Sequence, residues 1–205
     1  MKSIILASNS PRRAELLSQI GISFEVIPSD KEEHAPISQM PEDFVVKTAS
    51  LKGEHVLSKL LKDKCNLNQI VVAADTAVCI DGEILGKPRD SKDAREVLRR
   101  YSAREILVYT GIFVAKYNLS FTGYEMTKVR FVKLSESDIE SYVASGEPLD
   151  KAGSFGIQGL GAQFVESIDG CYYNVVGLPF ALLRRLLLKL GFEIVCGKIT
   201  EKVTT

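Results

Sequence analysis

The sequence has no excess of charge of either sign. Its 205 residues include 26 Lys and Arg and 26 Asp and Glu, so the formal net charge is zero. Proteins that bind duplex nucleic acid or anionic membranes usually do so through broad basic surfaces, which a neutral chain does not supply. We therefore expect neither duplex nucleic acid nor a membrane among the partners. A neutral net charge does not exclude a local basic pocket that binds a small anion.

Long apolar runs and paired cysteines are missing as well. No run approaches the about 18 apolar residues of a membrane-spanning helix, and the apolar residues near the N-terminus are too few for a signal peptide. The cysteines form no CxxC motif and are accompanied by two histidines, so neither a disulfide framework nor a zinc cage is indicated. We expect a reducing cytoplasm and inert buried thiols at Cys65, Cys79, Cys171 and Cys196.

The pattern that is present belongs to a globular α/β protein. Hydrophobic residues make up 45% and charged residues 25%, which is ordinary globular usage. Strand and helix patterns alternate first, and β-rich stretches then intrude, so we expect a mixed, twisted central sheet with helices on both faces. Expected strands are 3–7, 22–28, 70–74, 77–80, 83–85, 105–116, 120–133, 163–168 and 171–176. Expected helices are 12–20, a long one from 41, 91–102, 135–145 and 179–190, with a tail at 198–205.

Ser8, Arg12 and Arg13 lie at the first strand-to-helix turn, with Ser10 as the expected N-cap. A helix N-terminus offers free N–H groups to phosphate, and hydroxyls and guanidinium groups add further donors. Arginines in a first turn oppose the helix dipole unless an anion arrives. The alternative is a capped helix with solvated arginines.

Asp75 follows the apolar run 70–74, where an open α/β sheet places its ligands at the end of a strand. Such a carboxylate could hold a divalent ion or take a proton from water, or it could merely cap the next turn. Lys87 is held between Gly86 and Pro88. On its own, this lysine is better explained as an ordinary surface residue.

A glycine-rich passage from Glu147 to Gly159 carries Lys151 and Gln158. Its glycines allow close approach of a ligand, and the Gln158 amide can read the edge of a base. The alternative is a tight loop whose glycines serve only positive φ. Neither a GxxxxGK[ST] loop nor a GxGxxG motif is present, so a P-loop kinase and a dinucleotide enzyme are not supported.

Together these passages resemble the Maf family of nucleoside triphosphate pyrophosphatases, in order from about residue 3 to 190. The matching stretches are LASNSPRRAELL, the acidic pair Glu32 and Glu33, Lys52, AADT, LGKP, EPLDKAGSFGIQG and GCYYNVVGLP. The resemblance implies one domain over residues 1–197 with two lobes around a cleft, similar to the inosine triphosphate pyrophosphatase fold. It also implies hydrolysis of a nucleoside triphosphate to monophosphate and pyrophosphate with a divalent cation, Mg or Mn.

The resemblance also implies roles for individual residues. Asp75 matches the proton acceptor, with Lys87 and Glu33 beside it, and Glu33 and Asp75 could hold the metal. Arg12, Thr76 and Gln158 match the positions that set substrate choice. Ser8, Arg13, Lys52 and Lys151 complete the polar cleft. The Gly-Ile-Gln-Gly form resembles the branch acting on dTTP and UTP.

The sequence departs from the family pattern at Gly53, Ala74 and Phe155, where alanine, glycine and tyrosine are common. We expect the first two to matter little, whereas Phe155 removes a hydroxyl near the glycine loop and so bears on fine substrate preference. Two other functions stay open: a nucleotide-binding regulator of septum formation with little catalysis, and a protein-binding module. The carboxylates favour the enzyme, and the sequence leaves open whether the chain forms a homodimer.

Overall fold

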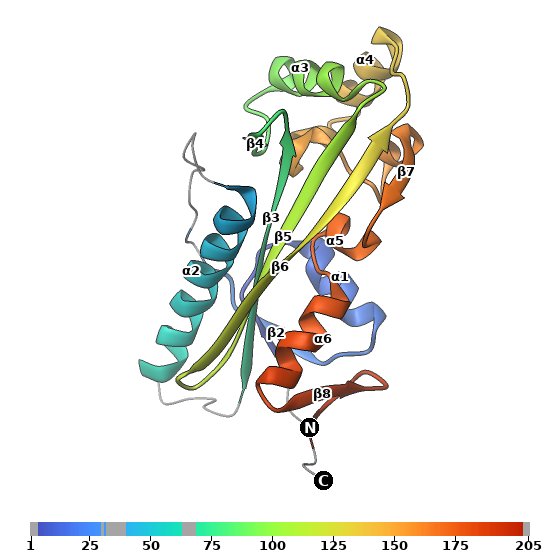
Figure 1. Ribbon diagram of the computed structural model, residues 1–205. Coiled ribbons are helices and arrows are strands. Elements are labelled where there is room, and N and C mark those ends of the chain that lie inside the picture. The colour runs from blue at the N-terminus through green and yellow to red at the C-terminus, as the bar shows by residue number, and fades with distance from the viewer. Residues whose placement is uncertain (1–3, 30, 32–39, 63–68, 203–205) are drawn as a thin grey trace.

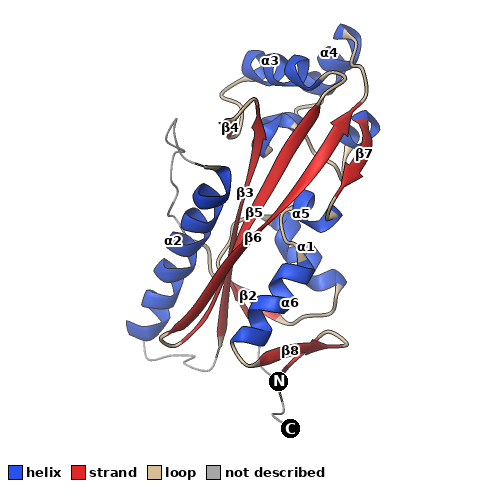
Figure 2. Cartoon of the chain, viewed as in Figure 1, coloured by secondary structure: helices blue, strands red, loops and turns tan. Residues whose placement is uncertain are grey.

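The computed structural model describes residues 4–29, 31, 40–62 and 69–202. Within them, a seven-stranded sheet has the order β2-β1-β3-β5-β6-β7, with β4 on the edge of β3 (Figure 2). β1 is parallel to β2 and β3, and the other pairs are antiparallel, which confirms the expected mixed sheet. The strands are β1 (Ile4–Leu6), β2 (Phe24–Val26), β3 (Ile70–Ile80), β4 (Glu83–Leu85), β5 (Glu105–Lys116), β6 (Leu119–Phe131) and β7 (Val165–Asp169).

Helices cover both faces of the sheet, as expected (Figure 1). They are α1 (Pro11–Gln19), α2 (Pro41–Lys62), α3 (Ser91–Tyr101), α4 (Glu136–Ala144), α5 (Tyr172–Val176) and α6 (Phe180–Lys189). Three short 3₁₀ helices, η1 (Glu147–Asp150), η2 (Ala152–Ser154) and η3 (Leu160–Phe164), shape the glycine-rich passage. α2 lies along one face, and α1, α5 and α6 lie on the other.

The side chains of β3 alternate between these two faces, because successive residues of a strand point in opposite directions. Val71 and Ala73 pack with the α2 residue Ala49, whereas Val72 and Ala74 pack in the core built with α1 and α6. A strand buried on both faces reads as a continuous apolar run, which is why the sequence signals it strongly.

Gly53 explains how closely α2 approaches the sheet. A Cβ at this position would lie 2.1 Å from the Phe113 ring. Glycine lowers the stability of the helix here, but it is the residue that allows α2 to pack this close to Phe113. Gly53 and Phe113 together set the distance at which the neighbouring Lys52 faces the sheet.

Three expectations are wrong. β3 does not end before Asp75 but continues to Ile80, because β5 pairs with it throughout, including Asp75 with Gly111. Residues 171–176 do not form a strand: α5 occupies 172–176 and ends at Gly177, whose φ of 116° closes the helix.

The expected tail also contains a strand. β9 (Lys198–Glu201) pairs with β8 (Phe192–Val195) in a hairpin. Ile199, only 3% exposed, joins the core beside α6, so burial of one apolar side chain orders this stretch. No helix among the described residues is long and apolar enough to cross a membrane.

Candidate functional site

The middle of β3 has an uncovered edge. On this edge β1 pairs with residues 70–72 and β4 with residues 78–80. Among the described residues, no strand pairs with residues 73–77 there. The Val72 carbonyl accepts from the Ala7 N–H on this edge, so the backbone groups of Ala74 and Thr76 point the same way. Asp75 and Thr76 therefore lie at an interruption inside the sheet.

Asp75 points to the α2 face, where it forms an ion pair with Lys52. The Lys52 Nζ lies 2.6 Å from Asp75 Oδ1, and the two side chains are 17% and 14% exposed. Among the described residues, no hydrogen bond to Oδ2 of Asp75 accompanies this pair, so the carboxylate is held in position through Oδ1 alone. Asp75 is thus not a turn cap, and the interior of a strand, rather than its end, presents it.

Thr76 points to the opposite face, where Arg13 binds it. The Arg13 guanidinium donates to Thr76 Oγ1 at 3.0 Å, to Ser8 Oγ at 3.0 Å and to the Gly177 carbonyl at 2.9 Å. Burial lowers the pKa of Arg13, which the negative charge of Asp75 opposes. Arg13 is 8% exposed. It is therefore not a solvated arginine but joins α1, β3 and the end of α5.

The Ser8 hydroxyl is oriented to donate a hydrogen bond to a ligand. Its Oγ accepts from the Arg13 guanidinium and from the Ser10 N–H at 3.2 Å, which occupies both lone pairs. Ser10 is the N-cap residue, as expected, but its side chain makes no capping hydrogen bond. The Ser8 hydroxyl and the uncapped first turn of α1 both offer donors to an anion.

The glycine-rich passage is organised by Glu147. Its carboxylate accepts from the Tyr142 hydroxyl at 2.9 Å and from the N–H groups of Leu160 at 2.8 Å and Gly161 at 3.2 Å. Burial raises the pKa of Glu147, but these donors outweigh burial and hold it below its usual range. A Cβ at Gly159 would lie 2.3 Å from this carboxylate. The Glu147 side chain thus links the start of the passage to the backbone that follows its end, at Leu160 and Gly161.

The glycines of this passage have two separate roles. Gly153 has a φ of 67°, which is the positive-φ role considered from the sequence. Gly156, Gly159 and Gly161 do not have positive φ but leave no room for a side chain against Glu147, Tyr142 or the loop backbone. The passage is therefore packed tightly around Glu147.

The remaining predicted ligands surround this passage. The Lys151 ammonium bonds to Asp150. The hydrogen bond from Lys151 and, to a lesser degree, the charge of Arg12 lower the pKa of Asp150. Lys87 is exposed, and the carbonyl of the preceding Gly86 accepts from the Gly153 N–H at 2.8 Å.

Gln158 is exposed on a turn of the loop. Among the described residues, no hydrogen bond joins the side chain of Gln158 or Lys87 to Asp75 or Thr76. Glu33 lies outside the described residues. Phe155 is 6% exposed, and its ring packs 5.2 Å from that of Phe131, so it belongs to the core.

Sequence reasoning missed Glu147, Tyr142, Thr110 and Asn174. Glu147 lay within a quoted motif and was not singled out, because its partners are backbone groups that carry no sequence signal. Asn174 lay within GCYYNVVGLP, and only its complete burial, with 0% exposure, identifies it as more than a surface amide.

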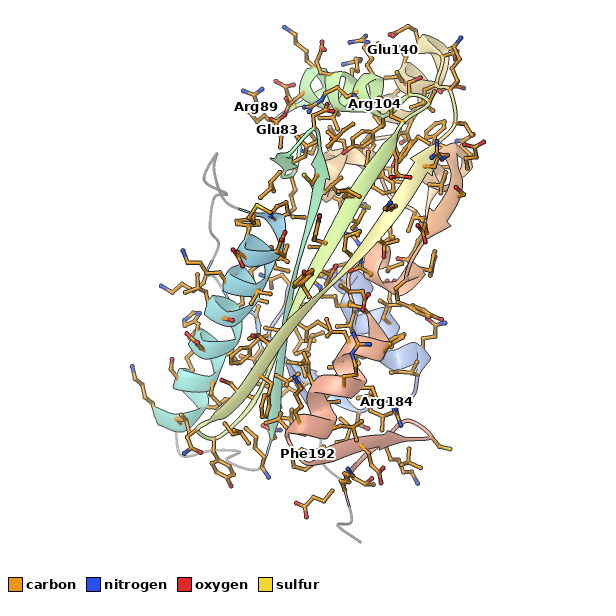
Figure 3. The ribbon with its side chains drawn as sticks, viewed as in Figure 1. Glu83, Arg89, Arg104, Glu140, Arg184 and Phe192 are labelled. Carbon is orange, nitrogen blue, oxygen red and sulfur yellow. The ribbon has the colours of Figure 1, made fainter. Side chains whose placement is uncertain are left out.

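The charged side chains around α3 and α4 do not form an anion site. Figure 3 labels Glu83, Arg104 and Glu140 in this part of the molecule. Here arginines meet carboxylates in surface ion pairs: Arg95 with Glu140, Arg99 with Glu136, Arg100 with Glu83 and Arg104 with Asp81.

The described residues contain no group of three or more His, Cys, Asp and Glu side chains able to hold a metal. Mg²⁺ is commonly bound by one or two carboxylates together with substrate phosphates, and needs no protein cage. Oδ2 of Asp75, which bonds to none of the described residues, fits such a shared site.

Comparisons with known proteins identify the family to which the chain is similar. A model of the Maf-like protein family matches residues 3–190. The chain is 43% identical over 201 residues to a dTTP/UTP pyrophosphatase of Caldicellulosiruptor bescii, covering 97% of this chain and 100% of the relative. It is 44% identical over 196 residues to a dTTP/UTP pyrophosphatase of Dictyoglomus thermophilum, covering 94% and 98%. A solved HAM1 protein from Coxiella burnetii aligns with 65% of this chain and with 75% of its own chain, at 14% identity and a TM-score of 0.44. The fold is assigned from the strand order and helices described above and not from this likeness.

Proposed function

The chain belongs to the Maf family, and from this premise we propose that it hydrolyses nucleoside triphosphates, dTTP and UTP foremost, to the monophosphate and pyrophosphate. The observation that carries the proposal is the Asp75–Lys52 pair at the uncovered stretch of β3, beside a turn rich in donors. Lys52 holds the carboxylate through Oδ1, and no described residue bonds to Oδ2, so this second oxygen is available to accept a proton.

Binding of the triphosphate follows from the donors at the edge of the site. The phosphates would lie at the N-terminus of α1, against the Ser8 proton and Arg12. Lys87 and Lys151 would offset further negative charge from the glycine-rich side. Arg13, buried and bonded to three protein groups, would position Ser8 and Thr76 instead of gripping phosphate itself.

The chemical step is attack of water on the α-phosphorus. The water oxygen forms a bond to phosphorus, the bond from phosphorus to the bridging oxygen breaks, and pyrophosphate leaves. Asp75 orients the water and accepts its proton, while Lys52 holds the carboxylate in position. A divalent cation, Mg or Mn, held by Asp75 and Glu33, would neutralise charge on the phosphates. Positioning and charge neutralisation dominate the rate of such reactions.

Choice of the base would fall to Gln158. Its amide has one donor end and one acceptor end, which match the O4 and N3–H edge of uracil or thymine. Its exposed place on the glycine-rich loop leaves the amide available to a ligand. A nucleotide substrate and the free thiols of Cys79, Cys171 and Cys196 suit a reducing cytoplasm. Of these three, only Cys79 is buried as expected, whereas Cys171 is half-buried and Cys196 is exposed.

Hydrolysis of UTP in oxygen-18 water tests the proposal. We expect release of pyrophosphate and label in UMP alone. Label in orthophosphate, with UDP accumulating, would show cleavage at the γ-phosphate and contradict the proposal. Tight binding of UTP without turnover would instead identify the nucleotide-binding regulator.

A further inference from the structure

A chain of three hydrogen-bonding groups runs from the site into the core. Thr76 Oγ1 lies 3.0 Å from Thr110 Oγ1, and Thr110 Oγ1 lies 2.9 Å from the carbonyl oxygen of Asn174. Thr110 and Asn174 are each 0% exposed, so neither can contact a substrate, whereas Thr76 is partly exposed.

The direction of these hydrogen bonds is fixed by the carbonyl. A carbonyl oxygen only accepts, so the Thr110 hydroxyl donates its single proton to Asn174. The Leu178 N–H, which could otherwise serve this carbonyl, donates to Tyr173. The Asn174 amide anchors the residue by donating to the Val108 carbonyl and to the Thr127 hydroxyl, both at 2.9 Å. Turning the Thr110 proton away would leave a buried carbonyl without a donor, which is costly.

Thr76 is consequently an acceptor toward any ligand. Because Thr110 has no proton left for Thr76, Thr76 donates to Thr110 and has no second proton to give. One of its lone pairs accepts from Arg13, and no donor among the described residues occupies the other. Ser8 has the opposite polarity, because both of its lone pairs are occupied and no acceptor among the described residues takes its proton. The same arginine therefore holds a donor and an acceptor side by side.

This polarity excludes phosphate as the partner of Thr76, because phosphate oxygens accept hydrogen bonds as well. The donors of a nucleotide nearest to its α-phosphate are the sugar hydroxyls. The 2′-hydroxyl is absent from dTTP, whereas the 3′-hydroxyl is common to dTTP and UTP. On the basis of the function proposed above, we propose that Thr76, oriented by Thr110 and Asn174, accepts a hydrogen bond from the 3′-hydroxyl of the substrate sugar.

A double-mutant cycle between enzyme and substrate tests the contact. Wild type and Thr76→Val are compared on dTTP and on 2′,3′-dideoxythymidine triphosphate, with Thr76→Ser as the matched control that keeps the hydroxyl. We expect removal of either hydroxyl to lower kcat/KM about tenfold, and removal of both to cost little more than one. A loss that is equal on the two substrates would show a structural role for Thr76 and overturn the inference.

The wild-type enzyme alone provides a second test, which does not depend on the folding of a variant. The 3′-amino analogue of dTTP keeps a donor, whereas the 3′-fluoro analogue has none. We expect the amino analogue to be used about as well as dTTP and the fluoro analogue to be as poor as the dideoxy compound. Equal use of the two analogues would overturn the inference. Failure of wild type to release pyrophosphate from dTTP itself would count against the proposed function instead.

Discussion

The two halves of the candidate site are held in place by different means. Around β3, side chains link four elements, α1, α2, β3 and the end of α5. Arg13 bonds to the side chains of Ser8 and Thr76 and to the Gly177 carbonyl, and Lys52 holds Asp75. The glycine-rich passage relies on backbone N–H groups gathered by the Glu147 carboxylate, with Gln158 exposed on its surface. The β3 half is preorganised, as a chemical step requires. The glycine-rich half presents the Gln158 amide, which would recognise the base, on a loop. We infer that the first half sets the rate and the second sets the preference for the base.

The largest effect is expected from Asp75→Asn. The amide keeps the shape but cannot accept the proton and lacks the charge, so kcat should fall about a hundred- to a thousandfold while UTP still binds. Pyrophosphate release and nucleotide affinity would be measured together, with thermal unfolding as the control for folding. Turnover at the wild-type rate would remove Asp75 from the chemical step.

Gly53→Ala tests how firmly α2 supports the β3 half. The added Cβ would meet the Phe113 ring, so we expect a loss of about 1–3 kcal/mol in the free energy of unfolding, despite the better helix propensity of alanine. Chemical denaturation measures it. A variant as stable as wild type would show that α2 can shift without cost, and the sequence-based expectation that this glycine matters little would stand.

Much of this arrangement could be predicted from the sequence, and what could not has a common cause. The apolar runs of β1 and β3, the amphipathic α2 and the 105–133 hairpin are local patterns. The pairing of Lys52 with Asp75 and of Thr76 with Thr110 joins residues 23 and 34 positions apart, which no local pattern encodes. Asp75 interrupts an apolar run, so the strand seemed to end there. Only the pairing with β5 carries it onward.

Glu147→Gln tests the other half. The neutral amide weakens the hydrogen bonds from Leu160 and Gly161, since bonds to a charged acceptor are stronger. We expect KM for UTP to rise about tenfold and the preference for the base to narrow, with a smaller change in kcat. Steady-state kinetics would be compared with Glu166→Gln, which removes the same charge from an exposed position on β7. A fall in kcat at constant KM would contradict the division between the halves.

The smallest effect is expected from acid. Because the pKa of Glu147 lies below its ordinary value of 4.5, its ionised form stabilises the folded loop above that pH. This contribution is lost as the pH falls through the lower, folded-state pKa. Thermal unfolding from neutral pH down to acid should therefore show a steeper loss below about pH 4.5 in wild type than in Glu147→Gln. If the unfolding temperature falls equally with pH in wild type and in Glu147→Gln, the ionised Glu147 carboxylate does not stabilise the loop.

A competition assay with UTP, dTTP, ATP and GTP, run on wild type, Asp75→Asn and Gln158→Ala, tests the central claim most directly. Wild type should prefer UTP and dTTP roughly ten- to a hundredfold in kcat/KM, since one mismatched hydrogen bond between the Gln158 amide and a bound base accounts for that range once the base shields the amide from water. Asp75→Asn should lower every value by a similar factor and keep the order, whereas Gln158→Ala should flatten the order more than it lowers the best rate. A purine preference in wild type, or an order that Asp75→Asn changes and Gln158→Ala leaves intact, would contradict the account.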